Sequence, residues 1–573
     1  MGGGECFQFV VHVVKGKWFT VFASLLIMAG AGATYIYGIY SKQIQKTLGY
    51  DEDAMNKITL YRDVGANVAI FAGLIAEVVP TWVVTLIGAA MNFGGYFMIW
   101  SAVTGKIAKP KVWHMCAYIA IGTNSQNFSN TAALVTCVKN FPESRGVVLG
   151  LMKGLVGLSG AILTQIFLGM YEDDLNSLIL LIGWLPAAVS VVFVFTLRTM
   201  KTERQPNELK VFLLFFYSTI VLAFYLMIMT LLEKYVTLGN AVHSKSAIVV
   251  TVLLFLPLYI VFKEERTLWK NKKERENPSP EMTIEKSEDS EPKQLAEEPK
   301  GSSFANIFNK PERGEDHGIL QAIQSVDMLF IFVISLCGYG TSLTAIDQFG
   351  RIGKAQGYSD RLVDSIITLV SIWNYYGRVY SGFVSELLLM KYKLPRSTMM
   401  TVVLFMSGIG MLFVAFPEIP FAFYVASVLI GFSFGAQVPL NLAMISEFFG
   451  LKYYSTLFNC AQLISPLGSF LLNAKLTKSL YLKEATKDLI AKGVDTSSVK
   501  DPTCIGHHCF RLSFSILAMV AFFGAFAALI LSKRTKEFYK GDIYRKYRVK
   551  EDEAYKRYKG ETYTMFREDS KAN

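Results

Sequence analysis

Two cations, Lys153 and Arg378, lie in stretches of the sequence that are otherwise apolar. Lys153 follows Arg145 by eight residues and Arg378 precedes Glu386 by eight, which on a helix corresponds to a depth of about 12 Å. A charge that deep in a membrane is costly unless it faces water or a partner. Both residues are therefore candidates for coordinating a substrate. The alternatives are a structural salt bridge or snorkelling for Lys153, and packing or gating for Arg378.

Side-chain amides form a second group of candidates, concentrated between Asn124 and Asn130 and again at Gln437 and Asn441. Amides without partners are costly in hydrocarbon, so they should face the interior of a helix bundle or a polar cavity. Substrate contact and hydrogen bonds between helices are both open interpretations. Nearby aromatic residues such as Tyr35 could form an aromatic wall. The candidate substrate-binding residues are Lys153, Arg378, Asn67, Asn124, Gln126, Asn130, Tyr35, Asn374, Gln437 and Asn441.

The elements that position these residues are predicted to be membrane-spanning helices. The chain is 52% hydrophobic and 18% charged, whereas soluble domains are roughly 25% charged. About 20 apolar residues cross a bilayer as a helix, and fourteen stretches of this kind occur. The expected spans are 18–40, 58–79, 82–104, 113–138, 146–170, 175–197, 211–232, 247–262, 326–347, 366–387, 398–416, 419–445, 455–472 and 510–532.

The spans predict an all-α membrane protein with two six-helix halves and about two extra helices between them. The basic clusters around Lys15, Arg198, Lys391 and Lys533 all fall on one side, which the positive-inside bias makes cytoplasmic. A segment rich in Lys, Glu, Pro and Ser is expected to be a disordered linker. The expected division is a cytoplasmic N-terminus (1–17), the first half (18–200), two additional helices (201–262), the linker (263–325), the second half (326–532) and a cytoplasmic tail (533–573).

The two halves share a motif at matching positions. The sequence from Gly73 to Glu77 has the pattern Gly-x-x-x-Glu, and Gly382 to Glu386 repeats it. The first copy ends 27 residues after a Gly-Tyr pair at Tyr50, and the second ends 28 residues after a Gly-Tyr pair at Tyr358. Nearly equal spacing indicates an internal repeat, and paired six-helix repeats around a central cavity are typical of secondary transporters.

The repeated motif resembles the loop signature of the major facilitator superfamily, with Glu in place of the usual Asp. Its basic end is missing from the first copy and weak in the second. The segments Asn140–Gly146 and Ser446–Lys452 resemble the partner motifs of that signature. The resemblance implies a cytoplasmic ion-pair latch, and an outer gate pair is expected from acids near the outer helix ends. The candidate gating residues are Glu77, Glu143, Arg145, Glu386, Glu447 and Lys452 for the latch, and Asp63 (beside Arg62) and Asp347 for the outer gate, where a proton relay is the alternative.

Three longer strings resemble the plant nodulin-like proteins, a branch of this superfamily that is distantly similar to oxalate/formate antiporters. They begin at Trp18, Thr136 and Phe448, and so occur in both halves. This resemblance implies a small organic or inorganic anion, such as a carboxylate or nitrate, as the transported substrate. An anionic substrate also agrees with the sequence of the first half, where no acidic residue lies at the depth of Lys153.

Cys504 and Cys509 lie together in the last outer loop, where their spacing favours a disulfide on a non-cytosolic face. His507 and His508 lie between them, but no further metal ligands accompany them, so no metal site is predicted. No nucleotide-binding loop, dinucleotide fingerprint or hydrolase motif is present. We therefore expect no enzymatic activity, no cofactor and no nucleic-acid partner.

The sequence predicts a multi-pass protein of the plasma membrane or an endomembrane (endoplasmic reticulum or vacuole) that transports a small-molecule anion by alternating access. Protons are a candidate coupling ion, and the lipid bilayer is the other partner. The alternatives are a neutral or cationic solute, with Lys153 in a salt bridge, and a receptor or scaffold that kept the fold without transporting.

Overall fold

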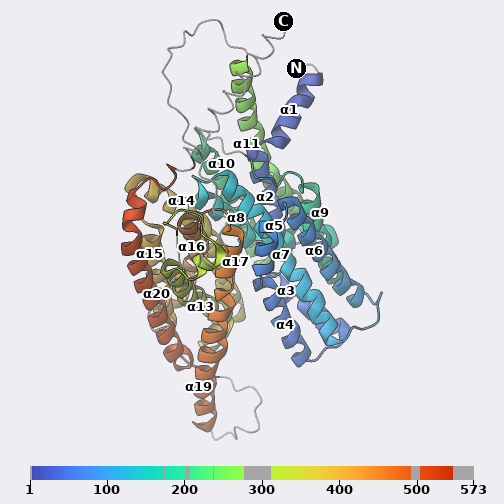
Figure 1. Cartoon of the computed structure of the whole chain (residues 1–573). Coiled ribbons are helices and arrows are strands. Elements are labelled where there is room, and N and C mark those ends of the chain that lie inside the picture. The colour runs from blue at the N-terminus through green and yellow to red at the C-terminus, as the bar shows by residue number, and fades with distance from the viewer. Residues whose placement is uncertain are drawn as a thin grey trace, which may run out of the picture.

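The computed structural model describes residues 3–172, 174–200, 207–236, 238–276, 311–491, 504–545 and 547. Within these ranges all regular structure is helical, so the predicted all-α class is confirmed. Figure 1 shows two lobes side by side. The helices of the first lobe are α2 (Lys17–Gly30), α3 (Tyr37–Leu48), α4 (Glu52–Asn67), α5 (Ile70–Val78), α6 (Thr81–Val103), α7 (Val112–Asn140), α8 (Arg145–Tyr171) and α9 (Leu175–Val192).

The second lobe follows a short helix, α12 (Ile319–Ile323). Its helices are α13 (Val326–Ala355), α14 (Asp360–Tyr392), α15 (Arg396–Ala415), α16 (Ala422–Phe449), α17 (Tyr454–Gln462), α18 (Ile464–Ser469), the π-helix η1 (Phe470–Thr477), α19 (Lys478–Ala491) and α20 (His508–Lys540). Between the lobes in sequence are the two additional helices, α10 (Glu208–Tyr235) and α11 (Asn240–Glu276).

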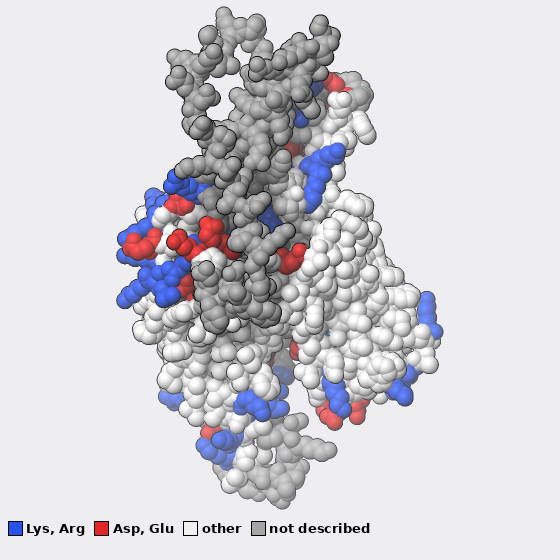
Figure 2. Space-filling view, viewed as in Figure 1, with Lys and Arg blue, Asp and Glu red and all other residues white. Residues whose placement is uncertain are grey.

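The bundle has two distinct ends. α1 (Gly3–Lys15) lies at one end and α19 at the other (Figure 1). The basic clusters of the sequence predict that the α1 end faces the cytoplasm, and the terms inner end and outer end follow this prediction. Figure 2 shows charged residues gathered toward the two ends, a largely uncharged band between them, and a hollow between the lobes on the outer side.

Ten described helices are long and apolar enough to cross a membrane, and a bent pair formed by α1 and α2 makes eleven. This number is smaller than the fourteen spans expected. Two of the missing spans correspond to α7 and α14, which are long helices that carry polar or charged residues. The third, expected at 455–472, is broken into α17, α18 and η1. Long polar helices and broken helices are features of transporter cores.

Local signals in the sequence explain where several helices begin. The Asp51 carboxylate accepts a hydrogen bond from the backbone N–H of Ala54 (2.9 Å) at the start of α4, and the Ser325 hydroxyl accepts one from Met328 (3.0 Å) at the start of α13. Such N-caps satisfy backbone donors that the first helical turn leaves free. α3 ends at Gly49, whose φ of 58° is a left-handed conformation that glycine adopts at little cost.

The expected linker at 263–325 is wrong at both ends. α11 does not end near Phe262 but continues as a helix to Glu276, and the chain is described again from residue 311. Arg313 forms an ion pair with Asp327 (2.5 Å), which ties this segment to the start of α13. Lys263–Glu276 is polar in composition, but it extends a long apolar helix that has already nucleated. The remainder of the expected linker, 277–310, lies outside the described residues.

The two additional helices are fixed to the first lobe. Trp18 of α2 is fully buried and packs against Phe141 (ring centroids 4.9 Å apart) and against Phe212 of α10 (5.1 Å). Lys17 forms an ion pair with Glu208 at the start of α10 (3.1 Å). These contacts place α10 and α11 on the flank of the first lobe.

Candidate functional site

Arg378 of α14 reaches the backbone of Lys153 of α8, so the two residues meet in the interior where the lobes touch. Arg378 Nη1 donates to the backbone oxygen of Lys153 (2.8 Å), and Arg378 Nε donates to the Asn374 amide oxygen (2.9 Å). The two cations are 6% and 5% exposed, and neither forms an ion pair with an acid among the described residues. Two buried basic side chains without a described acid make this a site of positive potential. Among the described residues, Lys153 therefore has no acid with which to form the structural salt bridge that was its alternative interpretation.

The second lobe adds unsatisfied polar groups to this site. The Asn441 amide donates to Ser335 (3.1 Å) and to the Tyr339 hydroxyl (3.0 Å), and the Gln437 amide donates to Ser342 (3.4 Å). The carbonyl oxygens of both amides are buried and have no hydrogen-bond partner in the structure. Unpartnered buried acceptors are costly, and here they leave Gln437 and Asn441 able to accept a further hydrogen bond.

In the first lobe, Asn124 and Gln126 stabilise breaks in neighbouring helices. The Asn124 amide donates to the backbone oxygens of Gly65 (2.9 Å) and Val68 (2.8 Å), beside the break between α4 and α5. In the amide orientation that satisfies both of its polar atoms, Gln126 donates to Ala31 O (3.1 Å) and accepts from Ala33 N (3.3 Å). Ala31 and Ala33 lie in the break between α2 and α3. These contacts match the helix-to-helix interpretation of the amide run.

The remaining substrate-binding candidates are divided between the two interpretations. The Asn67 amide donates to the backbone oxygen of Asp63 in its own helix (2.9 Å). The Asn130 carbonyl oxygen is buried without a hydrogen-bond partner. Tyr35 is 53% exposed and packs beside Gly160 of α8, where an added Cβ would lie 3.0 Å from the Tyr35 Cβ. Asn130 thus has an unsatisfied oxygen and Tyr35 an exposed side chain, whereas the Asn67 amide is bonded within its own helix.

The repeated glutamates reach across the lobes at the inner end. Glu386 of α14 accepts a hydrogen bond from the backbone N–H of Gly146, at the start of α8 (2.9 Å). Glu77 of α5 accepts bonds from the Ser455 hydroxyl and from Thr456 N (3.2 Å), at the start of α17. Each carboxylate therefore caps the N-terminus of the fifth helix of the opposite half, where the helix dipole stabilises negative charge.

Glycines allow the backbones of the two lobes to approach at these contacts. A Cβ added to Gly382 would lie 2.5 Å from Gly146 O, and one added to Gly73 would lie 2.8 Å from Ser455 O. A Cβ on Gly150 would lie 2.9 Å from Arg378 O. Since real side chains do not approach so closely, the inner closure depends on glycine at these positions.

Arg396 is the centre of a buried ionic cluster in the second lobe. Its guanidinium contacts Glu386 (2.7 Å), Glu447 (2.7 Å) and the Ser385 hydroxyl (2.6 Å). The Tyr539 hydroxyl donates to the second Glu447 oxygen (2.6 Å). One arginine thus forms ion pairs with two acids, which come from α14 and α16.

The segment after α20 joins this cluster to the first lobe. The Tyr544 hydroxyl lies 3.0 Å from Glu386 and 3.3 Å from Glu447, and the Arg145 guanidinium lies over its ring, 5.5 Å from the centroid. Burial, and then the two carboxylates, raises the pKa of Tyr544 well above its usual value. The hydroxyl therefore stays protonated and donates to these carboxylates.

Among the described residues, Arg145 and Lys452 make other contacts than the ion pairs that the resemblance implies. Arg145 donates to the backbone oxygens of Pro142 (2.7 Å) and Ser446 (2.7 Å) rather than to an acid. Lys452 Nζ lies over the Tyr453 ring, 5.4 Å from its centroid. Glu143 lies in the short connection between α7 and α8. The contacts described at the inner closure include helix caps, backbone acceptors and the ion pairs of Arg396.

The expected outer gate residues lie on α4 and α13. Asp63 pairs with its neighbour Arg62, whose guanidinium lies 4.5 Å from the centroid of the Tyr37 ring. Asp347 accepts a hydrogen bond from the Asn473 amide (3.0 Å) and interacts electrostatically with Asp63 and Arg62. The acids are therefore near each other across the lobes.

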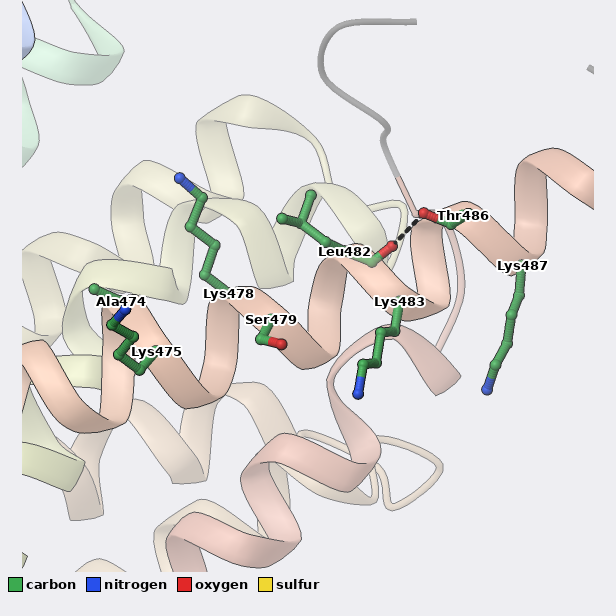
Figure 3. Close-up of a pocket in the computed structure, with 8 residues that line it drawn as sticks. All are labelled: Ala474, Lys475, Lys478, Ser479, Leu482, Lys483, Thr486 and Lys487. Carbon is green, nitrogen blue, oxygen red and sulfur yellow. Dashed lines mark hydrogen bonds between the residues drawn. The ribbon is translucent and has the colours of Figure 1, made fainter. Parts of the chain in front are cut away.

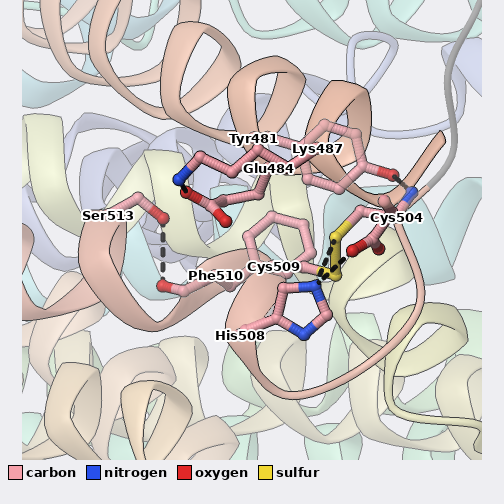
Figure 4. Close-up of a disulfide and its surroundings, with 9 residues drawn as sticks. Tyr481, Glu484, Lys487, Cys504, His508, Cys509, Phe510 and Ser513 are labelled. Carbon is pink, nitrogen blue, oxygen red and sulfur yellow. Dashed lines mark hydrogen bonds and ion pairs between the residues drawn. A yellow bond between two sulfur atoms is a disulfide. The ribbon is translucent and has the colours of Figure 1, made fainter. Parts of the chain in front are cut away.

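Cys504 and Cys509 form a disulfide at the outer end, where Cys504 N donates to the Tyr481 hydroxyl (3.1 Å) (Figure 4). His508 lies 2.9 Å from Asp488. The side chains of Asp488, Cys504, His508 and Cys509 are close together. A disulfide, however, removes both thiolates as metal ligands. The geometry therefore favours a structural staple over a metal site.

A pocket of about 800 Å³ lies along η1 and α19. It forms a basic surface, because its lining includes Lys475, Lys478, Lys483 and Lys487. Figure 3 shows that the lysines do not converge, since Lys478 points to the side opposite Lys483 and Lys487. Lys487 also pairs with Glu484 (2.6 Å). This surface can attract anions at long range, but it does not form a coordination site.

The architecture defines the class of the protein. A structure of the major facilitator superfamily proton:xylose symporter XylE, bound to 6-bromo-6-deoxy-D-glucose, matches with a TM-score of 0.53 and 11% identity, over 92% of this chain and 96% of that chain. A double Trp mutant of XylE matches with a TM-score of 0.54 and 12% identity, over 90% and 95% of the two chains. The fold is that of the major facilitator superfamily.

The sequence comparisons define the family within this class. The family model described as Nodulin-like matches residues 17–262, and the model described as NFD4, C-terminal domain, matches residues 313–541. Protein NUCLEAR FUSION DEFECTIVE 4 of Arabidopsis thaliana is 23% identical over 537 residues, which cover 91% of this chain and 89% of that protein. The chain belongs to the nodulin-like family of the major facilitator superfamily, and the predicted resemblance is confirmed.

Sequence reasoning missed Arg396, Tyr539 and Tyr544. Arg396 belongs to the basic cluster around Lys391, which the positive-inside bias explains without a buried role for any of its residues. Tyr539 and Tyr544 lie beyond the end of the last expected span. The signal that could have found Arg396 is its place at the start of a predicted helix, close in sequence to Glu386.

Proposed function

We propose that this protein is a secondary active transporter that moves a small organic or inorganic anion across a membrane by alternating access of its two lobes. The observation that supports the anion is the buried pair of Lys153 and Arg378, which lacks a described acid. A buried cation is stabilised only by a partner of opposite charge or by water. A carboxylate or nitrate-like anion between the two cations supplies that partner.

The two cations come from opposite halves, which suits transport. Lys153 belongs to α8 and Arg378 to α14, so an anion that contacts both side chains bridges the lobes. The unpartnered oxygens of Gln437 and Asn441 accept hydrogen bonds from hydroxyl groups or from a protonated acid. The site thus selects small anions and accommodates a donor group on them.

The inner closure supplies the conformational part of the mechanism. Glu77 and Glu386 hold the inner ends of the lobes together through backbone donors of α17 and α8, while the surface is hollowed between the lobes on the outer side (Figure 2). This is the arrangement expected of an outward-facing state. Inward opening requires both carboxylates to leave these helix N-termini.

A neutral polar solute is the second candidate. It is favoured by the buried amide oxygens of Asn130, Gln437 and Asn441, which lack partners and could bind hydroxyl groups. XylE, a proton:xylose symporter, has a similar fold. In this alternative water, rather than the solute, solvates Lys153 and Arg378.

Uptake by the purified full-length chain in proteoliposomes tests the proposal. Radiolabelled nitrate, oxalate and an auxin-like carboxylate are compared with xylose, each with and without an inward proton gradient. The proposal expects uptake of at least one anion, loss of that uptake in Arg378→Gln, and no effect of Lys46→Gln, an exposed lysine of α3. Uptake of xylose alone supports the second candidate, and uptake of nothing supports the receptor or scaffold interpretation.

A further inference from the structure

A groove of about 620 Å³ lies on the flank of the second lobe, between α10, α14, α15 and α16. This volume is within the range of about 300–1,000 Å³ that ligand sites occupy. The groove is separate from the Lys153 site, since neither cation lines it. Its lining is apolar and aromatic, and includes Phe216, Trp373, Tyr376, Tyr380, Val402 and Phe432.

The groove opens toward the surface of the bundle. Tyr380 and Val402 are about half exposed, whereas Val403 behind them is buried. The wall is rigid because aromatic rings pack on one another: Tyr380 lies 5.7 Å from Phe432, and Phe216 lies 4.7 Å from Phe383. A preformed apolar groove on the flank of a membrane bundle faces lipid rather than water.

The groove is long enough to hold an acyl chain that spans one leaflet of a bilayer. Along α14 it extends from Trp373 to Leu388, which is roughly 22 Å of helix at 1.5 Å per residue. The hydrocarbon of one leaflet is about 15 Å deep, half of a 30 Å core. An extended acyl chain therefore fits lengthwise in the groove.

The inner end of the groove is basic. Lys391 and Lys393 are exposed where α14 meets α15, next to the lining residues Leu388 and Leu394. Lys210 is exposed in the first turn of α10, the helix that supplies Phe216. None of these three lysines forms an ion pair with another described residue. Lysines at the membrane surface attract anionic head groups.

We propose that this groove binds one anionic phospholipid, with an acyl chain along α14 and the phosphate at Lys210, Lys391 and Lys393. This lipid site is independent of the transported substrate. Because Phe216 belongs to α10 and the other walls belong to the second lobe, the lipid joins the additional helices to that lobe. The lipid thereby fills a gap that direct contacts between α10 and α14 leave open.

Lipid retention by the purified full-length chain tests this site. The protein is exchanged into mixed micelles that contain equal amounts of phosphatidylglycerol and phosphatidylcholine, and bound lipids are counted by native mass spectrometry. We expect one phosphatidylglycerol to be retained. Replacement of the three lysines by Gln should weaken its retention by at least roughly tenfold, given about 1 kcal/mol for each charge.

Val402→Trp fills the groove and should also abolish retention, whereas Val252→Trp, at an exposed position of α11, should not. Glycerol phosphate without acyl chains should not compete with the lipid. Equal retention of the two lipids, or normal retention in Val402→Trp, would overturn the proposal. Formation of a dimer that Val402→Trp disrupts would also overturn it, because the groove would then be an interface between two copies.

Discussion

Lys153 determines whether the site is built for an anion. Its charge lies beside Arg378 without an acid, so the cation contributes nothing to stability through ion pairing. Lys153→Gln should therefore fold at least as well as the native chain, because it removes a buried charge that has no partner. Its affinity for the anion should fall by roughly 10–100-fold, the value of a hydrogen bond to a charged group.

Lys153→Arg keeps the charge and should retain part of the uptake. The measurements are uptake in proteoliposomes and the thermal unfolding midpoint of the purified protein, with Lys46→Gln as a control. A drop in the unfolding midpoint of Lys153→Gln that is rescued by removing an acid would show a structural salt bridge instead.

Arg396 is expected to behave in the opposite way. Its guanidinium forms ion pairs with Glu386 and Glu447, and all three side chains are buried. Arg396→Gln leaves two buried carboxylates unpaired and should destabilise the protein by about 3–5 kcal/mol, the usual effect of breaking a buried pair. The triple variant that also carries Glu386→Gln and Glu447→Gln should recover most of the loss. Unfolding in denaturant measures this, and an unaffected Arg396→Gln would contradict the arrangement.

Tyr544 connects the ionic cluster to the contact between lobes. Tyr544→Phe keeps the ring against Arg145 but removes the hydroxyl from Glu386 and Glu447. The lost bonds to charged groups should weaken the inner closure by about 1.5–3 kcal/mol, so the population of inward-open molecules should rise. Distances between spin labels on Lys139→Cys and Lys452→Cys, at the inner ends of the two lobes, report this change. Tyr392→Phe, at an exposed position, is the control.

At the scale of helices, the inner closure depends on backbone contact between α8 and α14. Gly382→Leu places a side chain where Gly146 O and Gly150 Cα lie within 3 Å of a Cβ. Such overpacking costs about 1–3 kcal/mol, which shifts a two-state equilibrium by roughly 5–150-fold. The same spin-label pair should show the inner end open. Gly94→Leu, in a part of α6 with open space around it, should leave the distances unchanged.

The repeat in the sequence located the inner closure correctly but not its chemistry. Glu77 and Glu386 could be found because nearly equal spacing marks equivalent positions in the two halves. Their partners could not, because these are backbone donors at the starts of α17 and α8, and any residue supplies such a donor. Arg396 escaped for a related reason, since a basic residue near a helix end satisfies the topology rule whether or not it is buried.

The helix breaks were also beyond the reach of the sequence. The apolar stretch that begins at Trp18 predicts one continuous span, yet the chain breaks between α2 and α3. The break is stabilised by Gln126, about ninety residues away in sequence. Amides in a helix report that polar partners exist, but the identity of a partner depends on tertiary packing. For the same reason, the sequence leaves open whether Asn124 contacts a substrate or a helix.

For the whole molecule, two lobes closed at the inner end and a hollow at the outer end follow from where the small and charged residues lie (Figure 2). Glycine contacts and helix caps act at the inner end, whereas the disulfide and the basic surface of α19 belong to the outer end. A disulfide persists only in a non-reducing compartment, which agrees with the side that the basic clusters predict for this end.

This orientation gives a prediction that involves the whole chain. Epitope tags inserted near Ser290, between α11 and α12, and near Lys492, after α19, should lie on opposite sides of the membrane. An odd number of crossings separates these two positions if α13–α16 and the broken α17–η1 segment each cross once. Antibody access before and after permeabilisation of cells measures the sides, with the tag near Ser290 protected in intact cells if the protein is at the cell surface. Both tags on one side would rule out the broken helix as a crossing, and with it the pairing of two six-helix halves.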